Sequence, residues 1–99
     1  MTSKKIEQHD ELCRLLHDTY IRKNTAYGDS FGKSYEVWGI SAAAIRLTDK
    51  FNRFINLAKN PQLNTGDEAI TDTLLDMANY ALMTILEIEK GIELLMTHD

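Results

Sequence analysis

The sequence of 99 residues contains one cysteine and one proline, and it has no long uninterrupted hydrophobic run. A single cysteine excludes an internal disulfide and is the usage that a reducing cytoplasm permits. The apolar stretches are too short to cross a membrane, and the first residues become polar too early for a secretory signal peptide. The sequence therefore predicts a soluble cytoplasmic protein that makes no membrane contact.

Basic residues are in the minority, because 11 lysines and arginines stand against 15 acidic residues and give a net charge of -4. A protein that binds nucleic acid non-specifically needs a dominant basic surface to neutralise phosphates, so no direct nucleic-acid binding is expected. The length suits a single domain over residues 1–99 with one modest core.

What the sequence does have is helical periodicity over most of its length. Apolar residues recur at helical spacing in three segments, residues 4–23, 40–59 and 65–96. Residues 24–35 contain two glycines and predict a loop. We therefore expect an all-α bundle of three main helices, in which the second and third pack antiparallel and the first packs across them.

Acidic residues line one side of the predicted third helix. Thr65 and Glu68 form a capping box at its start. Glu68, Asp72 and Asp76 then follow one another at steps of four, which places three carboxylates along one face. Like charges at this spacing repel each other, and the helix dipole no longer offsets the repulsion at Asp76. Two interpretations stay open: a metal or ligand site at Asp72 and Asp76, or salt bridges to another helix.

The predicted second helix carries the opposite charge, with four basic residues and one acidic residue between Arg46 and Lys59. Salt bridges between the two helices are the simplest explanation. The functional alternative is that Arg46, Lys50 and Arg53 bind phosphates, while the facing acids hold a divalent cation that bridges to them. Asp49, within the basic patch, is either a partner that sets the helix register or a metal ligand.

The apolar residues of these two helices predict extensive burial. The third helix is apolar nearly all round from Met77 to Ile88, as in a helix that several neighbours bury. A monomer of this length would struggle to cover such a helix, so a homodimer or larger homo-oligomer is expected. The second helix has an expected buried stripe of Ile40, Ala43, Ala44, Leu47, Phe51, Phe54, Ile55 and Ala58.

Aromatic residues gather around the predicted loop. In one interpretation, rings beside glycines, with Lys23 and Asn24 just upstream, hold a base and its phosphates. In the other, the rings fill space in the bundle, and the sequence leaves both open. The aromatic residues are Tyr27, Phe31, Tyr35 and Trp38.

Three blocks of residues together resemble the nucleotide modification associated domain family, which occurs in phages and bacteria. The resemblance spans Tyr20 to Tyr80 and implies a nucleotide or nucleotide-like small molecule as partner, in the host cytoplasm if a phage encodes the protein. The blocks are Lys23-Asn24 with Tyr27 to Phe31, Arg46-x-x-Asp49-Lys50-x-x-Arg53, and Glu68-x-x-x-Asp72 with Asp76, Asn79 and Tyr80. The candidate ligand contacts within them are Lys23, Asn24, Tyr27, Asp29, Ser30, Phe31, Arg46, Lys50, Arg53, Asn79 and Tyr80.

More distantly, the arrangement is similar to the all-α nucleoside triphosphate pyrophosphohydrolases, which bind magnesium through acids on two helices and act as dimers or tetramers. This resemblance implies Mg²⁺ held by Asp49, Glu68, Asp72 and Asp76, with Asp72 and Asp76 as catalytic residues. Those enzymes pair E-x-x-E with E-x-x-D, whereas the second helix here offers only Asp49. Fewer acids predict weaker metal binding, and the extra bases predict that the protein neutralises phosphate directly.

Three functions follow as hypotheses. The protein is a Mg²⁺-dependent nucleoside triphosphate pyrophosphohydrolase, or a non-catalytic module that binds or sequesters a nucleotide or nucleotide-derived signal in phage–host conflict, or a structural interaction domain. The sequence contains no unmistakable nucleophile or general base, so the first two hypotheses stand on an equal footing.

Overall fold

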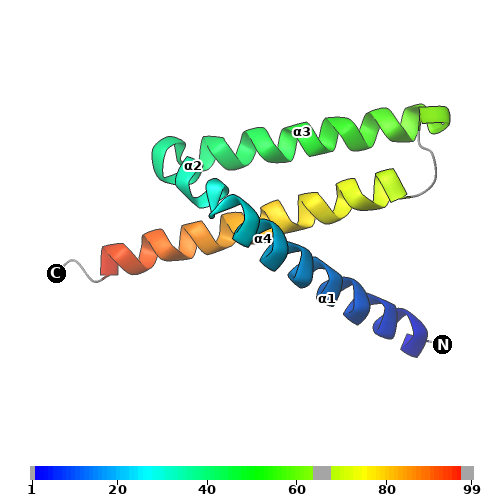
Figure 1. Ribbon diagram of the computed structural model, residues 1–99, viewed down its shortest axis with the longest axis horizontal. Coiled ribbons are helices and arrows are strands. Elements are labelled where there is room, and N and C mark those ends of the chain that lie inside the picture. The colour runs from blue at the N-terminus through cyan, green and yellow to red at the C-terminus, as the bar shows by residue number, and fades with distance from the viewer. Residues whose placement is uncertain (1, 64–67, 97–99) are drawn as a thin grey trace. The chain divides into compact units, whose positions relative to one another are not determined.

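The computed structural model describes the backbone of residues 2–63 and 68–96, and the side chains of residues 3–63 and 69–96. Within these ranges the secondary structure consists of helices alone (Figure 1). They are α1 (Thr2–Tyr27), α2 (Ser30–Trp38), α3 (Ile40–Lys59), the 3-10 helix η1 (Pro61–Leu63) and α4 (Glu68–Met96). The all-α prediction is confirmed. No helix in the described ranges combines the length and apolar character that a membrane span requires.

The chain divides into two compact units, Met1–Ser30 and Phe31–Asp99. The first unit consists of α1 and the turn after it, and the second contains the other helices. The prediction that the first helix packs across the other two stays a prediction. The capping box predicted at Thr65 and Glu68 lies outside the described residues.

The prediction of a loop over residues 24–35 is wrong, because α1 continues through Tyr27 and α2 already begins at Ser30. Only Gly28 and Asp29 separate the two helices, and both have positive φ angles of 60° and 56°. The Asp29 amide donates a hydrogen bond of 3.2 Å to the Asn24 carbonyl, which closes the turn. Glycine adopts this left-handed conformation without a steric penalty, and aspartate tolerates it better than most residues, so α1 ends and α2 begins within two residues.

A second glycine separates α2 from α3. Gly39 has φ 64° and ψ -149°, a combination that is essentially restricted to glycine. Its amide donates to the Tyr35 carbonyl at 2.8 Å, and its carbonyl accepts from the Ala42 amide at 3.0 Å. One residue therefore provides a hydrogen-bond partner for a backbone carbonyl at the end of α2 and for a backbone amide at the start of α3.

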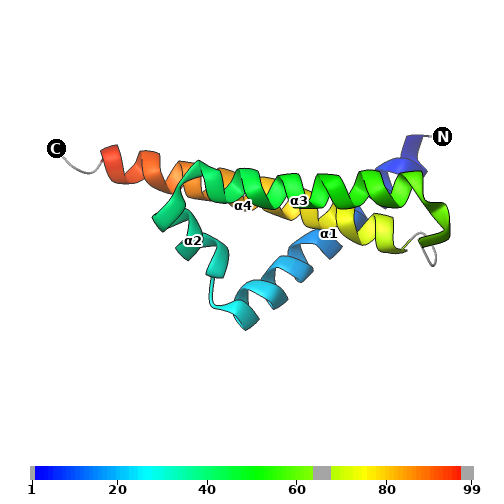
Figure 2. The same ribbon diagram turned by 90° about the horizontal axis from the view of Figure 1, so that it is seen from above.

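Helices α3 and α4 lie side by side and antiparallel, as predicted, and form a hairpin (Figures 1 and 2). The observed bounds of α3 coincide with the predicted ones. Ala43, Leu47, Phe54 and Leu57 recur at helical spacing on α3 and are buried or half-buried. This row is the face of α3 that packs against α4.

The expected burial of the other apolar residues of the hairpin is only partly met. Within the described ranges, Ala42, Ala43 and Leu57 are the only hydrophobic residues that are buried. The physical reason is that α4 covers one side of α3, whereas the predicted stripe is wide enough for two neighbours. Large side chains of α4 between Met77 and Ile88 are likewise exposed, and α4 continues through Gly91 without ending. Exposed members of the predicted α3 stripe are Ile40, Ala44, Phe51 and Ala58.

Candidate functional site

Lys50 and Asp76 form an ion pair that joins α3 to α4. The Lys50 Nζ donates to the Asp76 Oδ2 at 3.0 Å. The two side chains are only 29% and 24% exposed, so this pair is shielded from solvent more than a surface ion pair is. The oppositely charged faces predicted for the two helices do meet here, through a lysine.

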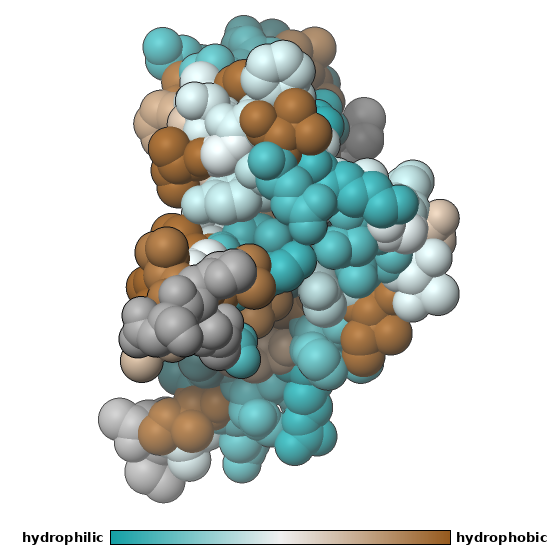
Figure 3. All heavy atoms as spheres, turned by 90° about the vertical axis from the view of Figure 1, so that its left-hand side faces the viewer, coloured by the Kyte–Doolittle hydropathy of each residue, from teal (hydrophilic) through white to brown (hydrophobic). Residues whose placement is uncertain are grey.

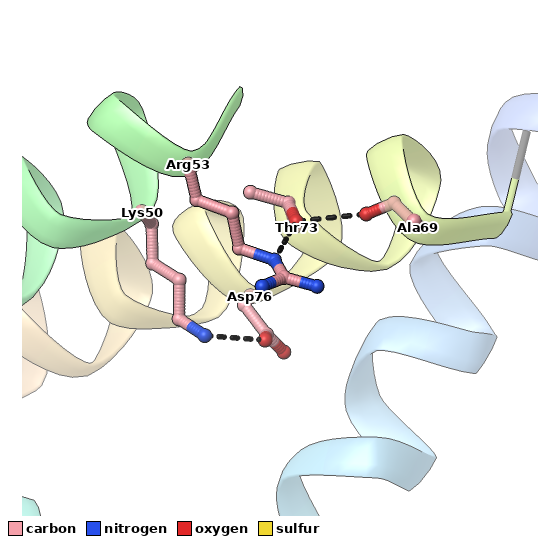
Figure 4. A network of polar contacts seen from close by, with 5 residues as sticks. All are labelled: Lys50, Arg53, Ala69, Thr73 and Asp76. Carbon is pink, nitrogen blue, oxygen red and sulfur yellow. Dashed lines mark hydrogen bonds and ion pairs between the residues drawn. The ribbon is translucent and has the colours of Figure 1, made fainter. Parts of the chain in front are cut away.

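Arg53 bonds to a hydroxyl group instead of a carboxylate (Figure 4). Its Nε donates to the Thr73 Oγ1 at 3.1 Å, and the Thr73 hydroxyl in turn donates to the Ala69 carbonyl at 2.8 Å. Thr73 is 2% exposed and has both its donor and its acceptor capacity in use. The guanidinium is therefore held at one nitrogen by a fixed, buried partner.

The predicted bridges from Arg46 or Arg53 to the acids of α4 do not form within the described residues. The two Nη groups of Arg53 have no hydrogen-bond or ion-pair partner there, and neither has the exposed side chain of Arg46. Asp72 is also exposed without such a partner in the described part of the chain, one helical turn before Asp76. We call the side of the hairpin that carries Arg46, Lys50, Arg53, Asp72 and Asp76 the polar side.

The remaining predicted metal ligands do not join this group. Asp49 is exposed and lines an open hollow of about 260 Å³ together with Ala44, Ile45 and Thr48, all of them from α3. The side chain of Glu68 lies outside the described residues. Among the residues that the structure does describe, no three His, Cys, Asp or Glu side chains gather closely enough to hold a metal ion.

Aromatic rings connect α2 to α4. The Phe31 ring lies 5.6 Å from the Tyr80 ring at an interplanar angle of 54°, and 6.3 Å from the Tyr35 ring at 46°. Tilted pairs at these distances are stabilising. The Phe31 ring thus packs against α4, whereas Tyr27 and Trp38 are exposed, and Asn79 is buried.

Five predicted ligand contacts lie in the first unit, at the end of α1 and in the turn that follows. The side chains of Lys23, Tyr27, Asp29 and Ser30 are exposed, and Asn24 is half-buried. The second unit holds all the others, and it brings Lys50 to Asp76 and Phe31 to Tyr80.

Sequence reasoning missed Thr73 as a member of the site. Threonine is a modest helix former, and its hydroxyl can bond to the carbonyl four residues earlier, as it does here with Ala69. Thr73 also lies three residues before Asp76, and therefore on a neighbouring part of the same helix face. A threonine inside the buried face of a helix, opposite an arginine, is the signal that could have identified it.

Comparison with known proteins identifies one family. The model of a family described as nucleotide modification associated domain 1 matches residues 23–88, two thirds of the chain. No curated protein and no solved structure matches the sequence. The matched range includes α2, α3, most of α4 and every residue of the polar side.

Proposed function

The chain belongs to the nucleotide modification associated domain 1 family, and we propose that it binds the phosphates of a nucleotide on the polar side of the α3–α4 hairpin. The observation that carries this proposal is the state of Arg53. Thr73 fixes its Nε, while the side chain as a whole is exposed and both Nη groups have no partner among the described residues.

Such an arginine suits an anion with several oxygens. A guanidinium presents its donors in a rigid fork that matches two phosphate oxygens at once, and a fork that is already oriented loses less freedom on binding. The charge of Lys50 is offset by Asp76, whereas the charges of Arg46 and Arg53 are not offset within the described chain. These two arginines are therefore the main source of attraction for phosphate.

The spacing of the two arginines indicates the size of the ligand. Arg46 and Arg53 are seven residues apart on α3, so they lie on the same side of the helix and about 10 Å apart along its axis. Two long side chains at this separation can contact neighbouring phosphates of one diphosphate or triphosphate. The base would then extend along α4 toward Asn79 and Tyr80. Tyr80 is half-buried and paired with Phe31, so the base would stack on the part of the ring that Phe31 leaves uncovered.

Magnesium is part of the proposal as a companion of the phosphates. Mg²⁺ usually keeps several waters and binds through one or two carboxylates together with the ligand's phosphates. The polar side fits that pattern, because Asp72 is exposed and without a partner in the described chain, but it does not form an all-protein cage. Asp72 would hold the ion, and Asp76, already bonded to Lys50, would contribute less. The ion would supply charge stabilisation at the phosphates.

Calorimetric titration tests the binding proposal. Nucleoside mono-, di- and triphosphates are titrated with and without magnesium into wild type, Arg53→Lys and Lys59→Ala. Arg53→Lys keeps the charge but loses the fork, so the Kd should rise about 10-fold or more. Lys59→Ala removes a positive charge from the same helix away from Arg53, and should leave the Kd within about 3-fold. If no nucleotide binds, or if the two variants bind equally, the proposal is wrong.

Hydrolysis is tested with the same set of nucleotides. Release of pyrophosphate in the presence of magnesium, abolished by Asp72→Asn and by Asp76→Asn, would identify the protein as a pyrophosphohydrolase. Binding without any turnover would identify it as a non-catalytic nucleotide-binding module. Both variants should retain the helical circular dichroism spectrum of wild type, which separates a lost activity from a lost fold.

A further inference from the structure

We propose that two copies of this chain associate through the side of the α3–α4 hairpin opposite the polar side, which we call the apolar side. Residues two apart on an α-helix are rotated by about 200° around its axis, so they point to nearly opposite sides. Phe51 and Arg53 on α3 are two apart, and so are Leu74 and Asp76 on α4. Both apolar residues are exposed, and they therefore lie on the side of the hairpin away from the network in Figure 4.

Each helix contributes a continuous row of uncharged residues to the apolar side. Successive members of each row are alternately four and three residues apart, which is the heptad spacing by which one helix packs along another. Exposure in the α4 row reaches 45% at Leu74 and 76% at Leu95. The α4 row is Leu74, Ala78, Ala81, Ile85, Ile88, Ile92 and Leu95, and the α3 row is Ala44, Thr48, Phe51, Ile55 and Ala58.

Helix α2 does not cover these rows. It is held to α4 by the ring contact between Phe31 and Tyr80 and by the hydrogen bond of 3.3 Å from Lys90 to Glu36. Lys90 is two residues before Ile92, so it too points away from the apolar side. In the view along the hairpin in Figure 3, hydrophobic side chains gather along the left-hand edge, and hydrophilic ones occupy much of the remaining face.

A second copy is the occupant that matches two rows at once. One additional helix can fill the groove between two helices, but burying both rows along their length takes a pair of helices. The same hairpin from a second copy supplies two rows with the same spacing and no charge, and a two-fold axis makes each copy's rows the partner of the other's. The outcome is a bundle of four helices, each contributing its heptad row to a shared core.

The shapes of the two rows also suit each other. Both rows contain small as well as large residues: Ala58 follows Ile55 on α3, and Ala81 precedes Ile85 on α4. Small side chains leave room for large ones from a facing helix, which allows the helices to interdigitate. The hollow of about 260 Å³ at Ala44 and Thr48 is an indentation on the edge of this face. A stable interface buries roughly 800 Å² on each partner, and two helix faces are large enough to supply it.

The test is the mass of the nucleotide-free protein in solution, measured by light scattering and by sedimentation equilibrium between about 1 and 100 μM. Wild type should have twice the chain mass of 11.3 kDa. Ile85→Glu and Phe51→Glu each place two unpaired charges in the symmetric interface, and should raise the dissociation constant about 100-fold or more. Val37→Glu is the matched control, because it places the same charge at a residue that is 70% exposed on α2, outside the apolar side. The mass of this variant should equal that of wild type.

Two results would overturn the proposal. A wild-type monomer at 100 μM would show that the apolar side does not hold two copies together. An oligomer that Ile85→Glu and Phe51→Glu leave intact would mean that another face associates. If both variants fail to fold, wild type alone decides, because the melting temperature of a folded dimer rises with protein concentration and that of a monomer does not. Arg53→Ala should associate like wild type, so a failure of nucleotide binding leaves this test intact.

Discussion

Truncation of Lys50 and of Arg53 to alanine should separate the structural part of the polar side from its ligand-binding part. Lys50→Ala removes an ion pair whose two groups are about three quarters buried. The expected loss is about 1–2 kcal/mol, between the values for exposed and fully buried pairs. Arg53→Ala removes one hydrogen bond from an exposed side chain to a neutral hydroxyl, so the expected loss is about 0.5–1 kcal/mol.

The two variants should change in the opposite order when nucleotide is added. A ligand at 100 times its Kd stabilises the folded protein by about 2.7 kcal/mol. Loss of the Arg53 fork should raise the Kd about 10- to 100-fold, which leaves about 0.4–1.4 kcal/mol of this stabilisation at the same ligand concentration. Because Asp76 already offsets the charge of Lys50, Lys50→Ala should keep the larger part of the ligand effect.

Thermal denaturation measures both effects in one experiment. Wild type and the two variants are melted at one protein concentration, with and without magnesium and the nucleotide that calorimetry identifies. For a chain of this length, 1 kcal/mol corresponds to about 4–8 °C in Tm. The reasoning is refuted if Arg53→Ala lowers the Tm of the unliganded protein as far as Lys50→Ala does while it keeps the full shift on addition of nucleotide.

Two further predictions concern the support of the site. Thr73→Val should change unliganded stability by less than about 1 kcal/mol, because the Arg53 side chain is exposed and can turn its Nε to water. It should nevertheless weaken nucleotide binding several-fold in calorimetry, whereas Thr73→Ser keeps the hydroxyl and should bind like wild type. Gly39→Ala should destabilise the protein by about 1–3 kcal/mol, since a φ of 64° strains any residue other than glycine. Gly91→Ala should stabilise it by about 0.5–1 kcal/mol, because alanine is the better helix former and its Cβ meets nothing within 4 Å. Denaturant unfolding measures both signs, and two changes of the same sign would contradict the assignment.

The sequence by itself determined the long helices and the charge of their faces. The bounds of α3 follow from local periodicity between a glycine and a proline, and the opposite charges of residues 46–59 and 67–76 follow from spacing alone. The helix α2 escaped prediction because glycines usually mark loops, and here a turn of only two residues separates two helices. The family followed from three short blocks, and the match over residues 23–88 confirms it.

Only the tertiary structure decided which side chains meet. Periodicity defines a face about a third of a turn wide, whereas a contact depends on how far each helix is rotated about its own axis. That rotation brings Lys50, and not an arginine, to Asp76, and it places Thr73 beneath Arg53. It also leaves Phe51 and Ile85 exposed, although both lie in sequences that predict burial. The packing of the whole α3–α4 interface fixes the rotation, and no single segment contains that information.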